Sequence, residues 1–212
     1  MLQLNLDLEA WRKVRLLCGV DEAGRGALAG PVVGAAVVLP PGVEIAGVCD
    51  SKKLTPCRRQ ELFSHILTKA LGVGVGFIPA QEIDETDILT AALKAMRRAC
   101  ERLALRVEPE LVFVDGNQKI PDLPWPQEHF PQADAQSLSV AAASVVAKVL
   151  RDRYMRQLDE NYPGYEFSRH KGYPTREHVD CLRRLGLSPV HRRTFRPCAE
   201  CGNLEVHDIP IT

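Results

Sequence analysis

Several features that would place the chain in a special class are missing from its sequence. No run approaches the roughly 20 apolar residues that a membrane-spanning helix needs, and residues 1–7 lack the charged-then-apolar order of a signal peptide. The seven cysteines are odd in number and scattered, which argues against a disulfide framework and for a reducing compartment. We therefore expect a soluble, cytoplasmic protein with no membrane partner.

A structural zinc site has little support in the sequence. Cys198 and Cys201 form one Cys-x-x-Cys pair, with His207 nearby. Structural zinc usually takes four ligands, and no second Cys pair follows at finger-like spacing. The sequence therefore favours isolated cysteines over a zinc centre.

The chain also has no formal net charge, but its charges are unevenly distributed. The chain has 27 Lys and Arg against 27 Asp and Glu, yet residues 148–196 contain twelve basic against six acidic residues. The asymmetry is compatible with a basic half that faces phosphates and an acidic remainder that holds metal. It is equally compatible with solvated helix faces, and charge alone does not choose between the two.

Length and patterning indicate one α/β domain over residues 1–212. The chain is 45% hydrophobic and 25% charged, with no repeat, low-complexity segment or Gly/Ser linker. Short apolar, β-branched segments predict strands, and apolar residues at helical spacing predict helices. The expected strands are residues 15–20, 32–39, 73–78 and 111–114; the expected helices are 56–71, 88–103, 140–158 and one capped by Thr175; loops are expected at 23–31, 50–54, 122–130 and 162–174. The first two strands should pair as a hairpin within a mixed sheet.

Acidic residues occur where this pattern makes them costly. Asp21 and Glu22 follow the first strand, Asp115 follows the strand at 111–114, and Asp134 precedes the long helix. A buried carboxylate must be solvated, paired or bound to metal. Because successive strand side chains point to opposite faces, Asp21 and Glu22 could share a site only if the chain bends after them, at residues 23–26.

The chemistry of such acids leaves two interpretations open. Two hard cations held roughly 4 Å apart by carboxylates can activate water in phosphodiester hydrolysis, and Mg²⁺ or Mn²⁺ suits oxygen ligands better than zinc. From spacing alone, acids that cap helices or pair with Arg are the commoner case, because most acids lie on the surface.

Short motifs then reveal a likeness to a known family. The segment Gly19-Val20-Asp21-Glu22-Ala23-Gly24-Arg25-Gly26 resembles the opening signature of the ribonuclease HII family. Further segments match in family order at residues 29–33, 50–54, 114–117, 134–153, 162–165, 170–173 and 191–195. The resemblance covers about residues 15–197, which we take as the core, and leaves a tail at 198–212 without a predicted role. One departure is Ala133, where the family usually has Gly before the acid, which bears on the turn around Asp134.

The resemblance implies a ribonuclease H-like fold, with a central mixed β-sheet flanked by helices and a helical C-terminal part. It implies an endoribonuclease that hydrolyses the RNA strand of RNA/DNA hybrids. The enzyme would also cut 5′ to ribonucleotides embedded in duplex DNA, leaving 3′-hydroxyl and 5′-phosphate ends, and so remove misincorporated ribonucleotides. Two-metal catalysis with Mg²⁺ or Mn²⁺ is implied, with Asp21, Glu22, Asp115 and Asp134 as the catalytic metal ligands. We expect the protein to act as a monomer.

The resemblance also implies which residues bind substrate. Gly24, Arg25 and Gly26 would sense the ribose 2′-hydroxyl through the backbone, and Tyr173 would stack on the neighbouring sugar. From the residues alone, a plain hairpin turn and a packed loop aromatic are the simpler interpretations. Candidates for phosphate contact, any of which could instead be a surface charge, are Ser51, Lys52, Lys148, Arg192 and Arg193.

Two other functions are less consistent with the sequence. A non-catalytic module that binds hybrids is disfavoured because all four acids are present. A nuclease of the same fold that acts on DNA junctions or ends is disfavoured because the segment Gly24-Arg25-Gly26 has no obvious use without a 2′-hydroxyl. Two-metal chemistry needs no histidine base, so His170, His178 and His191 are expected to be structural.

Overall fold

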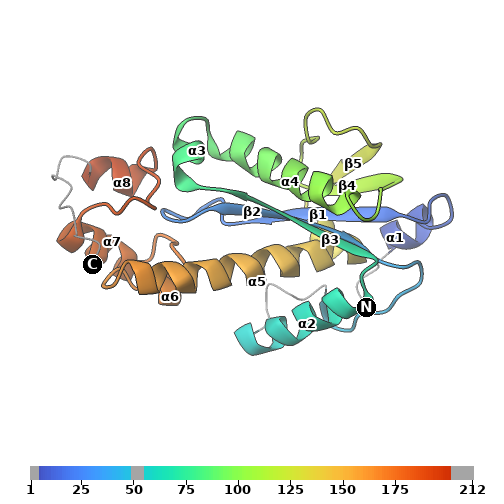
Figure 1. Ribbon diagram of the computed structural model, residues 1–212, viewed down its shortest axis with the longest axis horizontal. Helices are drawn as coiled ribbons and strands as arrows, with labels where there is room; N and C mark the ends of the chain where they lie inside the picture. Colours follow the sequence, from blue (N-terminus) through green and yellow to red (C-terminus); the bar gives the residue numbers. More distant parts are fainter. Residues whose placement is uncertain (1–4, 49–54, 202–212) are drawn as a thin grey trace.

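The computed structural model describes residues 5–48 and 55–201, and a mixed sheet lies at the centre of this part (Figure 1). Its strands are β1 (Leu17–Ala23), β2 (Val32–Val38), β3 (Gly72–Ile78), β4 (Leu111–Asp115) and β5 (Gln127–Phe130). Their order is β3-β2-β1-β4-β5. β2 pairs antiparallel with β1 and β3, whereas β4 pairs parallel with β1 and β5. The predicted hairpin and mixed sheet are confirmed.

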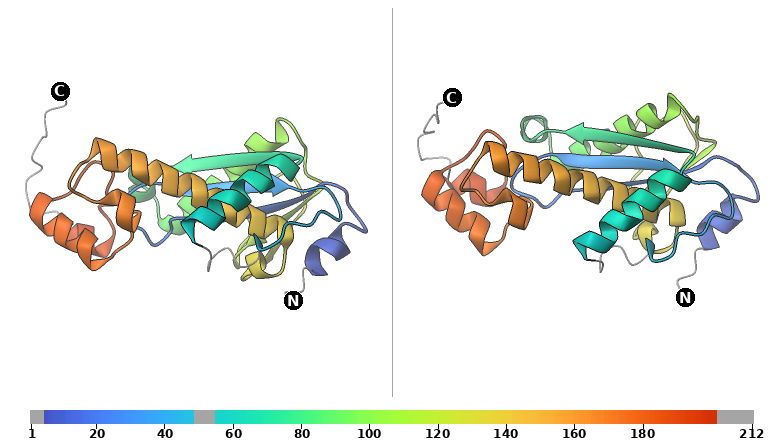
Figure 2. Two further views of the ribbon diagram at one scale, coloured as in Figure 1. Left: turned by 90° about the horizontal axis from the view of Figure 1, so that it is seen from below. Right: turned by 60° about the horizontal axis from the view of Figure 1, so that its bottom comes forward.

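Helices cover both faces of the sheet. α4 (Ile88–Ala104) packs on one face, and α5 (Leu138–Asn161) and α2 (Pro56–Lys69) cover the other (Figures 1 and 2). Strand β2 shows this directly, since Ala35 and Val37 pack with α5 and α2 while Ala36 and Val38 pack with α4. Alternating side chains of a strand point to opposite faces, so a strand covered twice must be apolar throughout.

Glycines in the strands permit the close approach of these layers, as Gly19 and Gly74 show. A Cβ on Gly19 of β1 would stand 2.1 Å from the carbonyl carbon of Ser139, in the first turn of α5. A Cβ on Gly74 of β3 would stand 2.0 Å from the carbonyl oxygen of Ala99 in α4. Both contacts are far inside van der Waals distance, so the helices pack here against bare backbone.

Strand β1 is longer than its apolar stretch predicts. Its ladder with β2 continues past Val20, pairing Asp21 with Ala35 and Glu22 with Gly34. Backbone hydrogen bonds form irrespective of side-chain polarity, so the acids do not end the strand. Asp21 and Glu22 therefore lie on β1 and not after it.

Short elements account for most other differences from prediction. β5 forms within residues 122–130, which were expected to be a loop, and Phe130 packs edge-on against Phe113 at 5.3 Å between ring centroids. A four-residue polar strand carries no periodic signal, and its parallel pairing with β4 decides its conformation. α6 (Phe167–His170) lies within the loop expected at 162–174, and α1 (Asn5–Ala10) and α3 (Ala80–Asp84) were not predicted.

The C-terminal part is helical, as expected, and gathers at one end of the sheet (Figure 1). It consists of α6, α7 (Arg176–Leu185) and α8 (Arg196–Cys201). The hydroxyl of Thr175 accepts from the backbone N–H of His178, which confirms the predicted cap of α7. Cys198 is buried against Leu28 and Leu182, and His207 lies outside the described residues. Within the described ranges, no helix is long and apolar enough to cross a membrane.

Candidate active site

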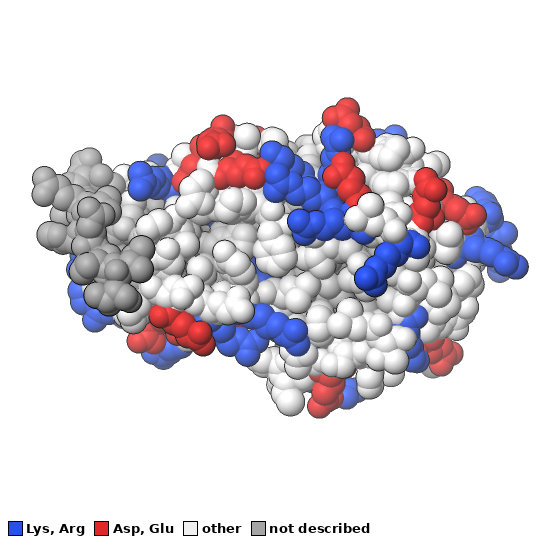
Figure 3. Space-filling model, in the orientation of Figure 1, with Lys and Arg blue, Asp and Glu red and all other residues white. Residues whose placement is uncertain are grey.

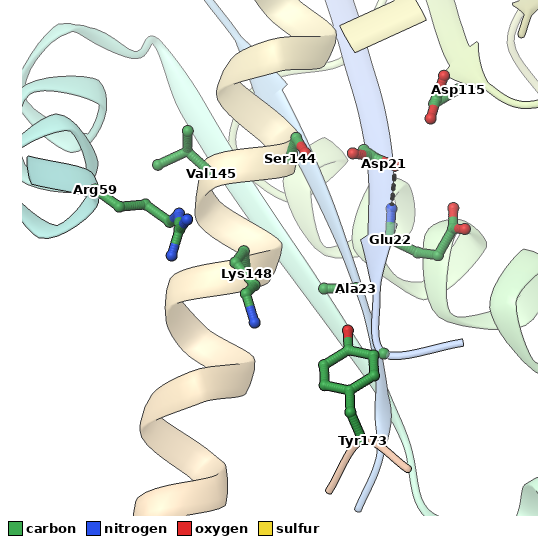
Figure 4. A pocket seen from close by; sticks show the side chains of 10 residues that line it. Asp21, Glu22, Ala23, Arg59, Asp115, Ser144, Val145, Lys148 and Tyr173 are labelled. Atoms are coloured by element: carbon green, nitrogen blue, oxygen red, sulfur yellow. Dashed lines mark hydrogen bonds between the residues drawn. The ribbon is translucent and has the colours of Figure 1, made fainter. Parts of the chain in front are cut away.

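A pocket opens where β1 and β4 separate. The two strands pair only as far as Val20 and Val114, so Asp21 and Glu22 lie beyond their last shared pair, beside Asp115. Ligand sites commonly form at the carboxyl ends of parallel strands. Residues from five parts of the chain line this pocket (Figure 4), namely Asp21, Glu22, Ala23, Gly24, Arg59, Asp115, Ser144, Val145, Lys148 and Tyr173.

Three predicted acids meet in this pocket. Asp21 is 4% exposed, and its Oδ1 accepts the backbone N–H of Glu22 at 2.7 Å. Burial raises the pKa of Asp21 well above its usual value, and the nearby charges of Glu22 and Asp115 raise it further. Burial also raises the pKa of Glu22, with Arg25 opposing that shift and Asp115 adding to it. The pocket thus concentrates negative charge in a partly dry environment.

A bend after the acids proved unnecessary for Asp21 and Glu22 to share a site. β1 continues through both residues to Ala23, and both still border the pocket. The two acids share the pocket because β1 and β4 no longer pair at this point. A side chain beyond the last shared pair can reach the opening between the strands from either face of the sheet. The expectation of a bend is therefore corrected.

The fourth acid lies next to the pocket and not in its wall. Asp134 is buried in the short 3-10 helix η2 (Ala133–Ala135). The backbone N–H of Ala133 donates to Oδ1 of Asp115 at 2.6 Å, which ties η2 to the end of β4. The left-handed backbone conformation falls on Gln132, with φ of 58°, so alanine at position 133 fits the turn without strain.

Cationic and aromatic groups face the acids from α5 and from the loop after α6 (Figure 4). The Nζ of Lys148 pairs with Oδ1 of Asp152 at 2.7 Å and lies 5.4 Å from the centre of the Tyr173 ring. Arg59 of α2 and Ser144 of α5 also line the pocket. Neither residue is a candidate from the sequence, because only the packing of α2 against α5 brings Arg59 there.

The glycine segment borders the pocket on one side. Gly24 has φ of +101°, and a Cβ there would stand 2.0 Å from Nε of Arg151. Gly26 is exposed, and a Cβ there would meet nothing within 4 Å. Arg25 is half exposed, and its Nη1 lies 3.4 Å from Oε1 of Glu22. Gly24 is thus required by the fold, whereas the fold makes no such demand at Gly26.

Arg151 is a residue whose role the sequence did not reveal. It is fully buried in α5, and its guanidinium donates to the carbonyl oxygens of Ala29, Pro31 and Lys171 at 2.9 to 3.1 Å. Its Cζ also lies 5.2 Å from the centre of the Tyr173 ring. One side chain therefore connects the segment after Gly26 to the loop that carries Tyr173.

The predicted phosphate contact at Arg192 is incorrect. Arg192 is 0% exposed, and its guanidinium donates to the carbonyl oxygens of Gly30 and Arg25. Burial lowers its pKa, and the neighbouring Arg151 lowers it further. A guanidinium enclosed in this way stabilises the loop and has no surface to offer a phosphate.

The other predicted phosphate contacts differ in position. Arg193 is exposed and lies outside the pocket, and its backbone N–H donates to Oδ2 of Asp84. Lys148 lines the pocket. Ser51 and Lys52 lie outside the described residues.

The carboxylates suit divalent metal ions in an open site. Among residues 5–48 and 55–201, no group of three or more His, Cys, Asp or Glu side chains is placed to hold a metal ion by itself. Mg²⁺ does not require one, because it retains several waters and binds through one or two carboxylates together with substrate oxygens. The raised pKa values of Asp21 and Glu22 reflect burial and negative charge that a cation would counter. The donor set therefore fits a hard divalent cation.

Fold and site together define a class of protein. Carboxylates that crowd at the opening of a mixed sheet, with cationic and aromatic groups beside them, are suited to metal-assisted hydrolysis of a phosphodiester. The family model for ribonuclease HII matches residues 18–198. The chain therefore belongs to the ribonuclease HII family and is a metal-dependent ribonuclease, with the activity of a ribonuclease H endonuclease.

Individual relatives agree with this assignment. The chain is 50% identical over 191 residues to ribonuclease HII of Geobacter sulfurreducens, covering 90% of this chain and 87% of that protein. It is similar to the crystal structure of ribonuclease H2 from Pyrococcus horikoshii OT3, with a TM-score of 0.74 and 30% identity. That match covers 87% of this chain and 96% of the other. The ribonuclease H-like fold is thereby confirmed.

Proposed function

We propose that this enzyme cuts the RNA strand of RNA/DNA hybrids and the phosphodiester 5′ to single ribonucleotides embedded in duplex DNA. The products would carry 3′-hydroxyl and 5′-phosphate ends, and the biological role would be removal of misincorporated ribonucleotides. The observation that carries the proposal is one pocket bordered by Asp21, Glu22, Asp115 and Tyr173. It combines acids that would bind metal ions with an aromatic ring suited to a nucleoside.

Asp21, Glu22 and Asp115 would hold two Mg²⁺ or Mn²⁺ ions, with Asp134 joining them from η2. When bound, such ions supply an activated water and stabilise the leaving oxygen. The chain's own part is to hold the carboxylates in place, through the bond from Glu22 N–H to Asp21 and the bond from Ala133 N–H to Asp115. Lys148, which lines the same pocket, would neutralise a backbone phosphate there.

Ribose recognition would come from the glycine segment and from Tyr173, which also border the pocket. Gly24, Arg25 and Gly26 would offer backbone groups to the 2′-hydroxyl, which both donates and accepts hydrogen bonds. The open space at Gly26 favours this, because a strand can approach bare backbone there. Tyr173 would stack on the sugar beyond the ribonucleotide, and Arg193 would contact phosphate outside the pocket.

Replacement of one acid tests the catalytic assignment. Asp21→Asn and Asp115→Asn keep the side-chain shape and remove the charge that a cation needs, so cleavage should fall by at least about a thousandfold. The assay uses an end-labelled DNA duplex with one ribonucleotide and 5 mM Mg²⁺ or Mn²⁺ in turn, with thermal unfolding as the control for folding. Undiminished turnover by either folded variant contradicts the assignment, and a wild type that retards the duplex without cutting it is a binding module.

Replacement of Tyr173 tests the recognition assignment. Tyr173→Ala should reduce cleavage at a single ribonucleotide more than cleavage of a long hybrid, because a long hybrid offers many alternative registers. Stacking on an aromatic ring contributes about 1–3 kcal/mol per base, or about fivefold to 150-fold in kcat/KM. Equal cleavage of the single-ribonucleotide duplex by variant and wild type would remove the stacking role.

Three further expectations stay predictions. These are a single domain over residues 1–212, a monomeric state and a cytoplasmic location. Analytical ultracentrifugation of the purified chain tests the monomeric state directly.

A further inference from the structure

Three buried histidines lie between the loop that carries Tyr173 and the C-terminal helices. His170 ends α6, His178 lies in the first turn of α7, and His191 precedes α8. The rings of His170 and His178 stack at 4.2 Å between centroids, and the Nε2 atoms of His178 and His191 lie 3.1 Å apart. None of the three borders the pocket.

The hydrogen-bond partners allow only one arrangement of protons in this chain of rings. Nδ1 of His178 lies 3.0 Å from the carbonyl oxygen of Tyr173, which can only accept, so Nδ1 must carry the proton. Nε2 of His178 is then an acceptor, and Nε2 of His191 must donate to it. Nδ1 of His191 is left as an acceptor, and both the N–H and the hydroxyl of Ser188 are placed to donate to it, at 2.9 and 2.7 Å.

His170 shows the opposite pattern. Its Nδ1 accepts the backbone N–H of Gly172 at 3.1 Å, so its Nε2 carries the proton and donates to the carbonyl oxygen of Tyr165 at 2.8 Å. Gly172 and Lys171 both have left-handed backbone conformations, with φ of 77° and 54°. A non-glycine residue in that region is strained and needs its surroundings to hold it.

The three rings are held neutral, as this proton arrangement requires. Burial lowers the pKa of His178 to about 4, and the neighbouring His170 contributes to that shift. Burial lowers the pKa of His191 to about 3, with a contribution from His178. At neutral pH each ring therefore has one donor and one acceptor.

We propose that Ser188, His191 and His178 form a directed hydrogen-bond relay that positions Tyr173 for the ribonucleotide. The relay fixes the main-chain carbonyl of Tyr173, which also accepts the N–H of Thr175 at 2.8 Å. The Tyr173 ring, on the pocket side of that backbone, then keeps its place beside Lys148 and Arg151. His178 and His191 act as positioning residues, and the inference rests on the proposed role of Tyr173.

Two near-isosteric variants of one residue separate positioning from packing. In His178→Asn the amide nitrogen can occupy the position of Nδ1 and still donate to Tyr173. In His178→Gln the amide reaches the position of Nε2, keeps a partner in His191 and loses the bond to Tyr173. We expect kcat/KM on the single-ribonucleotide duplex to be at least about tenfold lower for Gln than for Asn, with similar thermal unfolding temperatures.

The same pair in a Tyr173→Ala background is the control. Without the ring to position, the Asn and Gln variants should cleave equally. A difference of the same size in that background, or equal activity of the two folded variants in the wild-type background, overturns the proposal.

A direct measurement keeps the relay testable if both variants fail to fold. Proton–nitrogen correlation spectra of the wild-type imidazoles at pH 7 should show the proton on Nδ1 of His178 and on Nε2 of His170 and His191. Any other tautomer of His178 or His191 overturns the relay. A wild type that cleaves no embedded ribonucleotide would refute the proposed function instead, and it would leave the tautomers unchanged.

Discussion

Two glycines of one segment differ in what requires them. Gly24 has a positive φ and packs against Arg151, so any side chain there is strained and blocked. Gly26 has neither constraint, since a Cβ there would meet nothing within 4 Å. A glycine that the fold does not need points to something outside the fold, here the approach of a substrate strand.

Gly26→Ala should therefore separate stability from activity. The free energy of unfolding should stay unchanged or rise by up to about 1 kcal/mol, because alanine restricts the unfolded chain. Cleavage at a single ribonucleotide should fall at least about tenfold, because a methyl group would keep the strand from the backbone. Urea unfolding and duplex cleavage measure the two effects, and full activity of the variant would exclude close approach at Gly26.

The burial of Asp21 leads us to expect a conflict between stability and function at this position. Burial raises its pKa well above the usual value, so its contribution to stability is present at low pH and is lost as pH rises through the raised pKa. At pH 7 the buried negative charge lowers the free energy of unfolding, and asparagine removes that charge. Asp21→Asn should thus unfold at a higher temperature than the wild type without divalent ions, while being inactive.

Addition of Mg²⁺ gives the matching control. A cation that binds the folded state raises its unfolding temperature, so 10 mM Mg²⁺ should stabilise the wild type more than Asp21→Asn. Equal shifts in the two proteins would place the ion away from Asp21.

At the scale of elements, the contact between β1 and α5 aligns the two sides of the pocket. β1 carries Asp21 and Glu22, and α5 carries Ser144 and Lys148. Their spacing is set at Gly19, where the start of α5 touches bare backbone. The carboxylate of Asp7 in α1 accepts from both the N–H and the hydroxyl of Ser139, and so secures the same turn of α5.

Gly19→Ala should disturb both stability and alignment. A Cβ 2.1 Å from the backbone carbon of Ser139 forces the helix away from the strand, and overpacking of this kind costs about 1–3 kcal/mol. Urea unfolding should show that loss, with Gly26→Ala as the control that adds the same methyl group to open space. A stability equal to that of Gly26→Ala would mean that α5 moves without cost.

At the scale of the whole molecule, the buried histidines predict a loss of stability in acid. In the unfolded chain a histidine has a pKa of about 6.5. In the folded protein the pKa of His178 is lowered to about 4 and that of His191 to about 3. Their contribution is present above pH 6.5 and disappears as pH falls toward those values. Burial lowers the pKa of the adjoining His170. The charges of Glu177 and Asp159 raise it, and the charge of Lys171 lowers it. Urea unfolding from pH 7 to 4.5 should show the decline, and His178→Asn should have a shallower slope.

The distribution of charge also belongs to this scale. On the face seen in Figure 3, Lys and Arg side chains are interspersed with Asp and Glu side chains and form no continuous basic surface. The basic excess of residues 148–196 includes Arg151 and Arg192, which are buried and bond to main-chain carbonyls. A charge count along the chain therefore overstates what this segment offers to phosphate.

The sequence by itself determined the long helices, the apolar strands and the family, because periodic patterns and contiguous motifs are local properties. It also identified Asp21, Glu22 and Asp115, which the fold brings into one pocket. Tertiary structure decided the burial of Arg192, the bridging role of Arg151 and the proton arrangement from Ser188 to Tyr173. Each of these depends on contacts between segments distant in sequence or on the exclusion of water, and neither is encoded in a local pattern.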